Sequence, residues 1–253
     1  MDNARTRTIN RVKEYNGRMY AINRQTKAIV SSGDGLNWHE DVQLQNDILD
    51  FCVTPADTIV ILTARGVFSG TSGVDGWSHH DFGMSKEDRL YMGSIEQTQS
   101  GMLFVGSSFG LYKSDDQGYR WEEVEKEVSE DFATINLVFV DWDDQLMVFE
   151  EYESIFASKD QGKSWSALPA LDYSGYQLIQ NSDDRFYLLT SYGVHVSSDA
   201  HNFERLPLQD FTKSPYVLSN FSISGDKIIL SDGLSIYFGT INWESSYWDN
   251  GNI

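Results

Sequence analysis

The chain repeats one short motif, and the spacing of the copies restricts its fold more than any other feature. Residues 110–121 and 154–165 share a pattern: a small residue, two apolar residues, a variable residue, then Ser-x-Asp-x-Gly-x-x-Trp. Shorter copies occupy residues 32–38 and 197–203, and degenerate copies end at Trp77 and Trp243. The closing aromatics of the six copies are 39, 44, 44, 38 and 40 residues apart: Trp38, Trp77, Trp121, Trp165, Phe203 and Trp243. A regular repeat of this length predicts a series of similar structural units.

The segments between the turns have the pattern of β-strands. Short apolar runs bounded by Gly, Asp and Ser lie at residues 59–62, 103–106, 146–149, 186–189 and 227–230, and we interpret them as buried second strands. Residues 48–53 and 137–140 precede two of these runs and are expected to be first strands. No segment has a sustained helical period. The sequence therefore predicts an all-β fold, a six-bladed β-propeller of four-stranded antiparallel blades, with residues 1–253 as a single domain.

The repeated turn resembles the Asp-box (BNR) repeat of sialidases, sortilin-like receptors, some glucanases and the photosystem II assembly-factor propellers. The match is strongest at Asp116 and Asp160, good at Asp34 and Asp199, and poor in the second and sixth copies. The resemblance implies that each turn connects the third and fourth strands of a blade.

The chemistry of this turn is structural. The aspartate can accept hydrogen bonds from the amides of its own turn, the glycine can adopt a positive φ, and the aromatic residue packs between blades. The residues assigned to this role are Asp34, Trp38, Asp116, Gly118, Trp121, Asp160, Gly162, Trp165, Asp199 and Phe203.

A binding surface is expected on the face opposite these turns, where related families meet their ligands. Turns between second and third strands, and connections between blades, would form that face. The candidate binding residues are Arg24, Arg65, Phe109, Tyr152 and Tyr192. Tyr, Phe and Arg often anchor interactions, although scattered singly they are also ordinary loop residues.

The sequence supports no catalytic site. The Arg-Ile-Pro run of sialidases is absent, and the nearest segment, Ile-Asn-Arg-Val at residues 9–12, lacks the proline. Glucanases use a pair of carboxylates, but acids such as Asp141, Asp143 and Asp144 are too plentiful to single out a pair. His79 and His80 are adjacent, so on a strand they would point to opposite faces. We therefore expect no catalytic residue, no metal and no cofactor.

Charge limits the range of partners. The chain has 38 acidic and 19 basic residues, a net charge of −19, which repels phosphate backbones and argues against a nucleic-acid partner. No apolar run approaches the ~18 residues of a membrane-spanning helix, so no membrane insertion is expected. No signal peptide is visible at the N-terminus, so the expected location is the cytoplasm or a virion. Cys52 is the only cysteine and is expected to be a buried apolar residue.

These features favour a non-catalytic propeller that acts as a protein-interaction or structural module within a larger assembly. Asp-box propellers of this size occur among phage virion and tail proteins, which suggests an assembly of that kind. Two alternatives remain: a carbohydrate-binding or glycoside-hydrolase propeller, with a glycan as partner, and an assembly chaperone like the photosystem factors. Residues 5–9 are expected to supply the outer strand of the last blade and so to close the ring.

Overall fold

The computed structural model describes residues 9–85, 87–88, 90, 93–125, 132, 134–150, 154–169, 175–181, 183–190, 193–206, 220–224, 227–231 and 236–241. Their regular secondary structure consists of strands, and none of these segments forms a helix able to span a membrane. The chain divides into two compact units, unit 1 (Met1–Ser174) and unit 2 (Gly175–Ile253).

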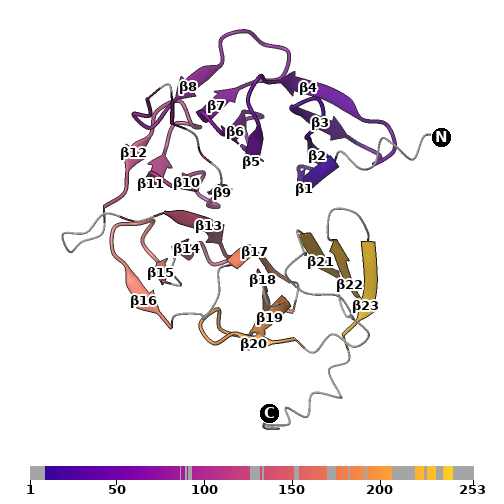
Figure 1. Cartoon of the computed structure of the whole chain (residues 1–253), viewed down its shortest axis with the longest axis vertical. Helices are drawn as coiled ribbons and strands as arrows, with labels where there is room; N and C mark the ends of the chain where they lie inside the picture. Colours follow the sequence, from indigo (N-terminus) through magenta and orange to yellow (C-terminus); the bar gives the residue numbers. More distant parts are fainter. Residues whose placement is uncertain are drawn as a thin grey trace. The chain divides into compact units, whose positions relative to one another are not determined.

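Unit 1 contains four four-stranded antiparallel sheets, each with its strands in sequence order (Figure 1). Sheet 1 consists of β1 (Ile9–Tyr15), β2 (Arg18–Asn23), β3 (Ala28–Ser32) and β4 (His39–Gln43). Sheet 2 consists of β5 (Ile48–Val53), β6 (Ile59–Thr63), β7 (Gly66–Gly70) and β8 (Ser78–His80). Sheet 3 consists of β9 (Gly93–Gln97), β10 (Leu103–Ser107), β11 (Gly110–Ser114) and β12 (Glu122–Glu123). Sheet 4 consists of β13 (Ile135–Val140), β14 (Leu146–Glu150), β15 (Ile155–Ser158) and β16 (Ser166–Leu168).

Unit 2 contains one four-stranded and one three-stranded antiparallel sheet. Sheet 5 consists of β17 (Gly175–Gln180), β18 (Phe186–Thr190), β19 (Gly193–Ser197) and β20 (Glu204–Arg205). Sheet 6 consists of β21 (Asn220–Ser224), β22 (Lys227–Ser231) and β23 (Ile236–Thr240).

The expectation of six four-stranded blades is therefore wrong, because the described residues build five such blades and a last sheet of three strands. The sequence gives a physical reason. The last copy of the repeat has no Asp between Phe238 and Trp243, so it lacks the acceptor that closes the turns between third and fourth strands in other sheets. The ring-closing segment expected at residues 5–9 lies outside the described residues except for Ile9, which begins β1.

The core lies in layers between neighbouring sheets. All five residues of each of β6, β10, β14 and β18 are buried, which confirms four of the five predicted buried second strands. In the fifth, β22, Ile228 and Leu230 are buried but Ile229 is 41% exposed. One cluster joins Val60 of sheet 2 to Val105 of sheet 3, and another joins Phe104 of sheet 3 to Val148 of sheet 4. Cys52 is buried in the first of these clusters, as predicted.

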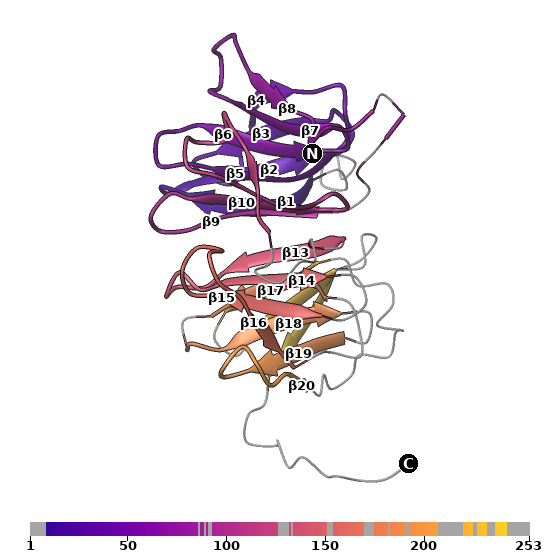
Figure 2. The ribbon, with the colours of Figure 1, turned by 90° about the vertical axis from the view of Figure 1, so that its left-hand side faces the viewer.

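The antiparallel order places the turns of each blade at two ends. In unit 1 the first strands β1, β5, β9 and β13 lie next to one another in succession, and Figure 2 shows strands of this unit lengthwise, with turns at both ends. Turns between first and second strands share one end with turns between third and fourth strands, and we call this end of unit 1 the Ser-x-Asp face. Turns between second and third strands, together with the connections between sheets, form the opposite face.

Candidate functional site

The Ser-x-Asp turns are closed by hydrogen bonds within the turn itself. Oδ1 of Asp34 accepts the amides of Leu36 at 2.9 Å and Asn37 at 2.8 Å, and Oδ1 of Asp160 accepts the amide of Ser164 at 2.9 Å. In all four turns the serine hydroxyl two residues earlier donates to the aspartate, at 2.8 to 3.0 Å. These carboxylates are occupied as acceptors by their own turns.

The same bonds keep three of the aspartates ionised. Hydrogen bonds from the Ser164 side chain and amide lower the pKa of Asp160 to about 2. Donors from Asn37 hold the pKa of Asp34 far below its usual value, and the Asn202 amide does the same, with further donors, for Asp199. A carboxyl group with so low a pKa holds no proton near neutral pH and cannot act as a general acid there.

Gly118 shows why the turn in sheet 3 requires glycine. Its φ is +83°, and a Cβ at this position would lie 2.5 Å from Oγ of Ser69 on the neighbouring sheet. Its carbonyl accepts hydrogen bonds from Nε1 of Trp121 at 3.0 Å and from Oγ of Ser69 at 2.8 Å. The turn is therefore bonded both to its own closing tryptophan and to the preceding sheet.

In two of the turns, the residue after the aspartate is a glutamine that forms a hydrogen bond to the preceding sheet. Oε1 of Gln117 in sheet 3 accepts a hydrogen bond from Oγ1 of Thr58 in the β5–β6 turn, at 2.7 Å. Nε2 of Gln161 in sheet 4 donates to Oγ of Ser100 in the β9–β10 turn, at 2.9 Å. Each glutamine thus links a third-to-fourth-strand turn to the first turn of the preceding sheet. The sequence analysis assigned no role to these glutamines.

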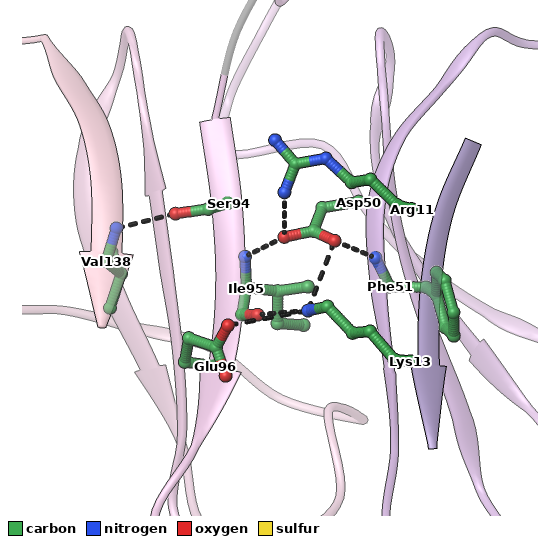
Figure 3. A network of polar contacts seen from close by, with 8 residues as sticks. All are labelled: Arg11, Lys13, Asp50, Phe51, Ser94, Ile95, Glu96 and Val138. Carbon is green, nitrogen blue, oxygen red and sulfur yellow. Dashed lines mark hydrogen bonds and ion pairs between the residues drawn. The ribbon is translucent and has the colours of Figure 1, made fainter. Parts of the chain in front are cut away.

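An ionic network around the buried Asp50 joins the first strands of sheets 1, 2 and 3 (Figure 3). The Asp50 side chain is 1% exposed, and its oxygens lie 2.9 Å from Nη1 of Arg11 and 3.2 Å from Nζ of Lys13. The same carboxylate accepts the amides of Phe51 at 2.9 Å and Ile95 at 3.1 Å. Nζ of Lys13 also lies 3.4 Å from Oε1 of Glu96. The network thus contains two basic and two acidic side chains, whose charges compensate one another.

The network shifts the pKa values of its members in opposite directions. Burial alone would raise the pKa of Asp50, but Arg11, Lys13 and the two amides together hold it below its usual value. Burial raises the pKa of Glu96, against the attraction of Lys13. Two carboxyl groups with divergent pKa values can divide the roles of acid and base. Asp50, however, is enclosed and bonded to two cations and two amides, so its role in this arrangement is to hold the strands together.

Similar side-chain bridges recur between other first strands. Oγ of Ser94 on β9 accepts the amide of Val138 on β13 at 2.6 Å, and Oε1 of Gln177 on β17 accepts the amide of Phe221 on β21 at 3.1 Å. A first strand pairs with only one neighbour in its sheet, so amides on its other edge need a partner. These side chains supply it, 44 or 45 residues before the amide in each case.

Three of the proposed binding residues lie on the opposite face, one on each of three successive sheets. Arg24 is exposed in the β2–β3 turn, Arg65 is half-buried in the β6–β7 turn, and Phe109 is 36% exposed in the β10–β11 turn. Nη1 of Arg65 donates to the carbonyl of Asp88. Tyr152 and Tyr192 lie outside the described residues.

An aromatic cluster surrounds the two adjacent histidines. The His79 ring stacks on Phe68 with centroids 4.3 Å apart, whereas His80 contacts Phe82 at 5.1 Å and Tyr112 at 6.3 Å. The two imidazoles thus contact different partners. Burial lowers the pKa of His80. Within the described part of the chain, no group of three His, Cys, Asp or Glu side chains is arranged to hold a metal ion.

Most of the exposed large apolar side chains stand on turns. Among the described residues these are Leu36 and Val74, at 84% and 58% exposed, Phe109, at 36%, and Tyr119 and Trp142, at 48% and 50%. Four of the five lie on the Ser-x-Asp face, where the sequence analysis placed no binding residue. The sequence around Trp142, Asp-Trp-Asp-Asp, drew attention only to its acids.

Comparison of the sequence with protein-family models and with curated proteins finds no significant match. Solved structures do match. The extracellular domain of BT4673 from B. thetaiotaomicron is 14% identical, with a TM-score of 0.69 over 91% of this chain and 32% of that one. Virginiamycin B lyase from Staphylococcus aureus is 10% identical, with a TM-score of 0.66 over 93% of this chain and 85% of that one. YCF48 bound to a D1 peptide is 20% identical, with a TM-score of 0.56 over 74% of this chain and 62% of that one.

These likenesses, together with the succession of sheets, show the fold: an all-β propeller with four-stranded antiparallel blades. The chain spans about a third of the length of the BT4673 domain. At 10 to 20% identity the comparisons concern the fold alone.

Proposed function

We propose that this propeller is a non-catalytic module that binds another protein. The observation that carries the proposal is the set of exposed apolar side chains on turns: Leu36, Val74, Phe109, Tyr119 and Trp142. The sheets that carry Val74, Phe109, Tyr119 and Trp142 bury their second strands completely, so the exposure of these four side chains is not a sign of a loose core. Aromatic side chains held on rigid supports are effective anchors because little conformational entropy is lost on binding.

The neighbour YCF48 supports a peptide as the recognised element. Its solved structure has a D1 peptide bound, so a chain with this fold can bind a segment of another protein. This favours a partner that presents a short segment, including the transient client of an assembly chaperone. The proposal also includes membership of a larger assembly, such as a phage virion or tail. It includes a location in the cytoplasm or in a virion as well.

The four Ser-x-Asp turns are, in this proposal, Asp boxes with a structural role. Support comes from their hydrogen bonds, because the aspartates at positions 34, 116, 160 and 199 all accept amides of their own turns. In the same proposal, Arg24, Arg65 and Phe109 contribute a second contact surface on the opposite face.

A pull-down from the native source, read by mass spectrometry, tests the protein-binding function. The bait variant replaces the five exposed apolar turn residues with serine, and the matched control replaces exposed polar residues of the same unit, Glu40 and Lys159, with serine. A stoichiometric protein that the wild type and the control retain, and the bait variant loses, is the expected result. A specific saccharide on a glycan array, with no protein retained, would reject the proposal in favour of the carbohydrate alternative.

A further inference from the structure

Trp142 stands on a turn whose backbone is firmly held. Its side chain is 50% exposed at the β13–β14 turn. Oδ1 of the buried Asp141 accepts the amides of Asp143 at 2.9 Å and Gln145 at 2.8 Å. Backbone hydrogen bonds from the Asp144 amide to the Asp141 carbonyl and from the Asp141 amide to the Gln145 carbonyl, both 3.1 Å, close the turn. An exposed indole on such a support is pre-organised for binding.

Two neighbouring turns brace the Trp142 turn. Gln99 in the β9–β10 turn donates its amide to Oδ1 of Asp144 at 2.6 Å and its side-chain Nε2 to the carbonyl of Trp142. Gln161 in the β15–β16 turn donates to Ser100 of that same β9–β10 turn at 2.9 Å. Three turns from sheets 3 and 4 therefore form one surface, the Trp142 platform, made of residues 98–101, 141–145 and 160–164.

The platform is acidic around its exposed aromatic. It contains four aspartates and one basic residue, Lys163. Asp143 is exposed directly beside Trp142, and hydrogen bonds from its own turn keep Asp160 ionised. The chain as a whole carries a net charge of −19. The partner that complements an exposed indole among carboxylates carries positive charge on long apolar stems, as lysine and arginine do.

We propose that the Trp142 platform binds a lysine- or arginine-bearing segment of the partner protein, a proposal that rests on the protein-binding function above. A cationic group of the segment lies over the indole face of Trp142 and pairs with Asp143. Tyr119, 48% exposed in the β11–β12 turn on the same face, gives the segment a second aromatic contact. The opposite charge of the platform attracts basic segments and repels acidic ones.

Fluorescence anisotropy tests this with a short fluorescein-labelled peptide in which lysine alternates with glycine, at physiological salt. The same peptide with glutamate in place of lysine is the reference. We expect the lysine peptide to bind and the glutamate peptide not to bind. Trp142→Ala should weaken binding about three- to fivefold, the range of one exposed cation–π contact. Trp142→Leu, which keeps an apolar side chain without a π face, should weaken it similarly if the alanine variant fails to fold.

Two matched controls separate the platform from the general charge of the protein. Val12→Ala shortens an exposed apolar side chain on β1, outside both proposed contact surfaces, and should leave binding unchanged. Asp143→Asn should weaken binding about twofold, whereas Asp75→Asn, which removes one charge from an exposed position in the β7–β8 turn, should not. Equal losses for Asp143→Asn and Asp75→Asn, or for Trp142→Ala and Val12→Ala, would overturn the proposal.

Further outcomes distinguish this inference from the proposed function. If the pull-down recovers a partner equally with the wild type and with Trp142→Ala, the protein-binding function stands but the Trp142 platform is not the binding site. No binding of the lysine peptide also overturns the platform proposal. The platform proposal is also overturned if the peptide does not bind but a soluble oligosaccharide does, and if that binding depends on Trp142. The ligand of the platform would then be a sugar.

Discussion

Asp50 shows how a single buried carboxylate can join three strands. It contacts Arg11 and Lys13 of β1 and accepts the Ile95 amide of β9. Removing one partner of a buried ion pair leaves the opposite charge without compensation, which costs about 3 to 5 kcal/mol. Asp50 is therefore expected to matter more for stability than any of the exposed acids on the surface.

Asp50→Asn should lower the free energy of unfolding by about 3 kcal/mol because Arg11 and Lys13 would stay close together without their buried counter-charge. Urea unfolding at neutral pH measures this. Asp57→Asn, at an exposed turn position in the same sheet with a φ of 59° that asparagine tolerates, is the control and should change stability little. A loss no larger than that of the control would show that the network adds nothing to stability.

The buried His195 is expected to make the free energy of unfolding depend on pH in the acidic range. It is 2% exposed on β19, and burial, assisted by the charge of Arg205, lowers its pKa to about 4. In the unfolded chain its pKa is about 6.5. Between these values the unfolded state binds the proton and the folded state does not, so stability falls as pH falls, by up to about 1.4 kcal/mol per pH unit.

Comparison of the wild type with His195→Gln by urea unfolding at pH 7 and pH 5 tests this window. The wild type should lose about 2 kcal/mol more than the variant over this interval. The contributions of His80 and Glu96, whose pKa values are also shifted, are common to both proteins and cancel. Parallel losses in the two proteins would mean that His195 titrates alike in the folded and unfolded states.

At the scale of the element, the Ser-x-Asp turn is a self-contained unit that the sequence reveals well. The serine, aspartate and glycine are spaced by the bonds they make, so the pattern predicted the positions of the third-to-fourth-strand turns. The ties between turns were not predictable in this way. Gln117 and Gln161 reach residues 59 and 61 positions earlier, and nothing local distinguishes them from ordinary polar turn residues.

Asp34→Ala should lower the melting temperature by a few degrees, because the amides of Leu36 and Asn37 lose their acceptor. Asp34→Asn keeps one side-chain oxygen and should lose less. Differential scanning fluorimetry of the wild type and the two variants measures the three melting temperatures, which should fall in the order wild type, Asp34→Asn, Asp34→Ala. Equal melting temperatures for all three proteins would contradict a structural role for this aspartate.

At the scale of the whole molecule, the repeat period predicted the all-β fold and the buried second strands. It failed at the last sheet, because counting the closing aromatic residues took Trp243 as the mark of a complete blade although that copy of the repeat has no Asp. The candidate site was sought on the face opposite the Ser-x-Asp turns, by analogy with related families. Trp142 was missed because exposure is a property of the folded chain, and its acidic neighbours were considered only as members of a possible carboxylate pair.

The bridges between first strands bear on how such a chain changes over time. An aspartate, a serine and a glutamine each accept one amide of the next first strand, so the requirement is an oxygen atom in the right place and not a particular amino acid. Duplicated copies can therefore drift apart in sequence, one acceptor replacing another, while the spacing of 44 or 45 residues is kept. The fold can thus be kept while the sequence changes: a structure 10% identical to this chain matches it with a TM-score of 0.66, although no sequence family matches.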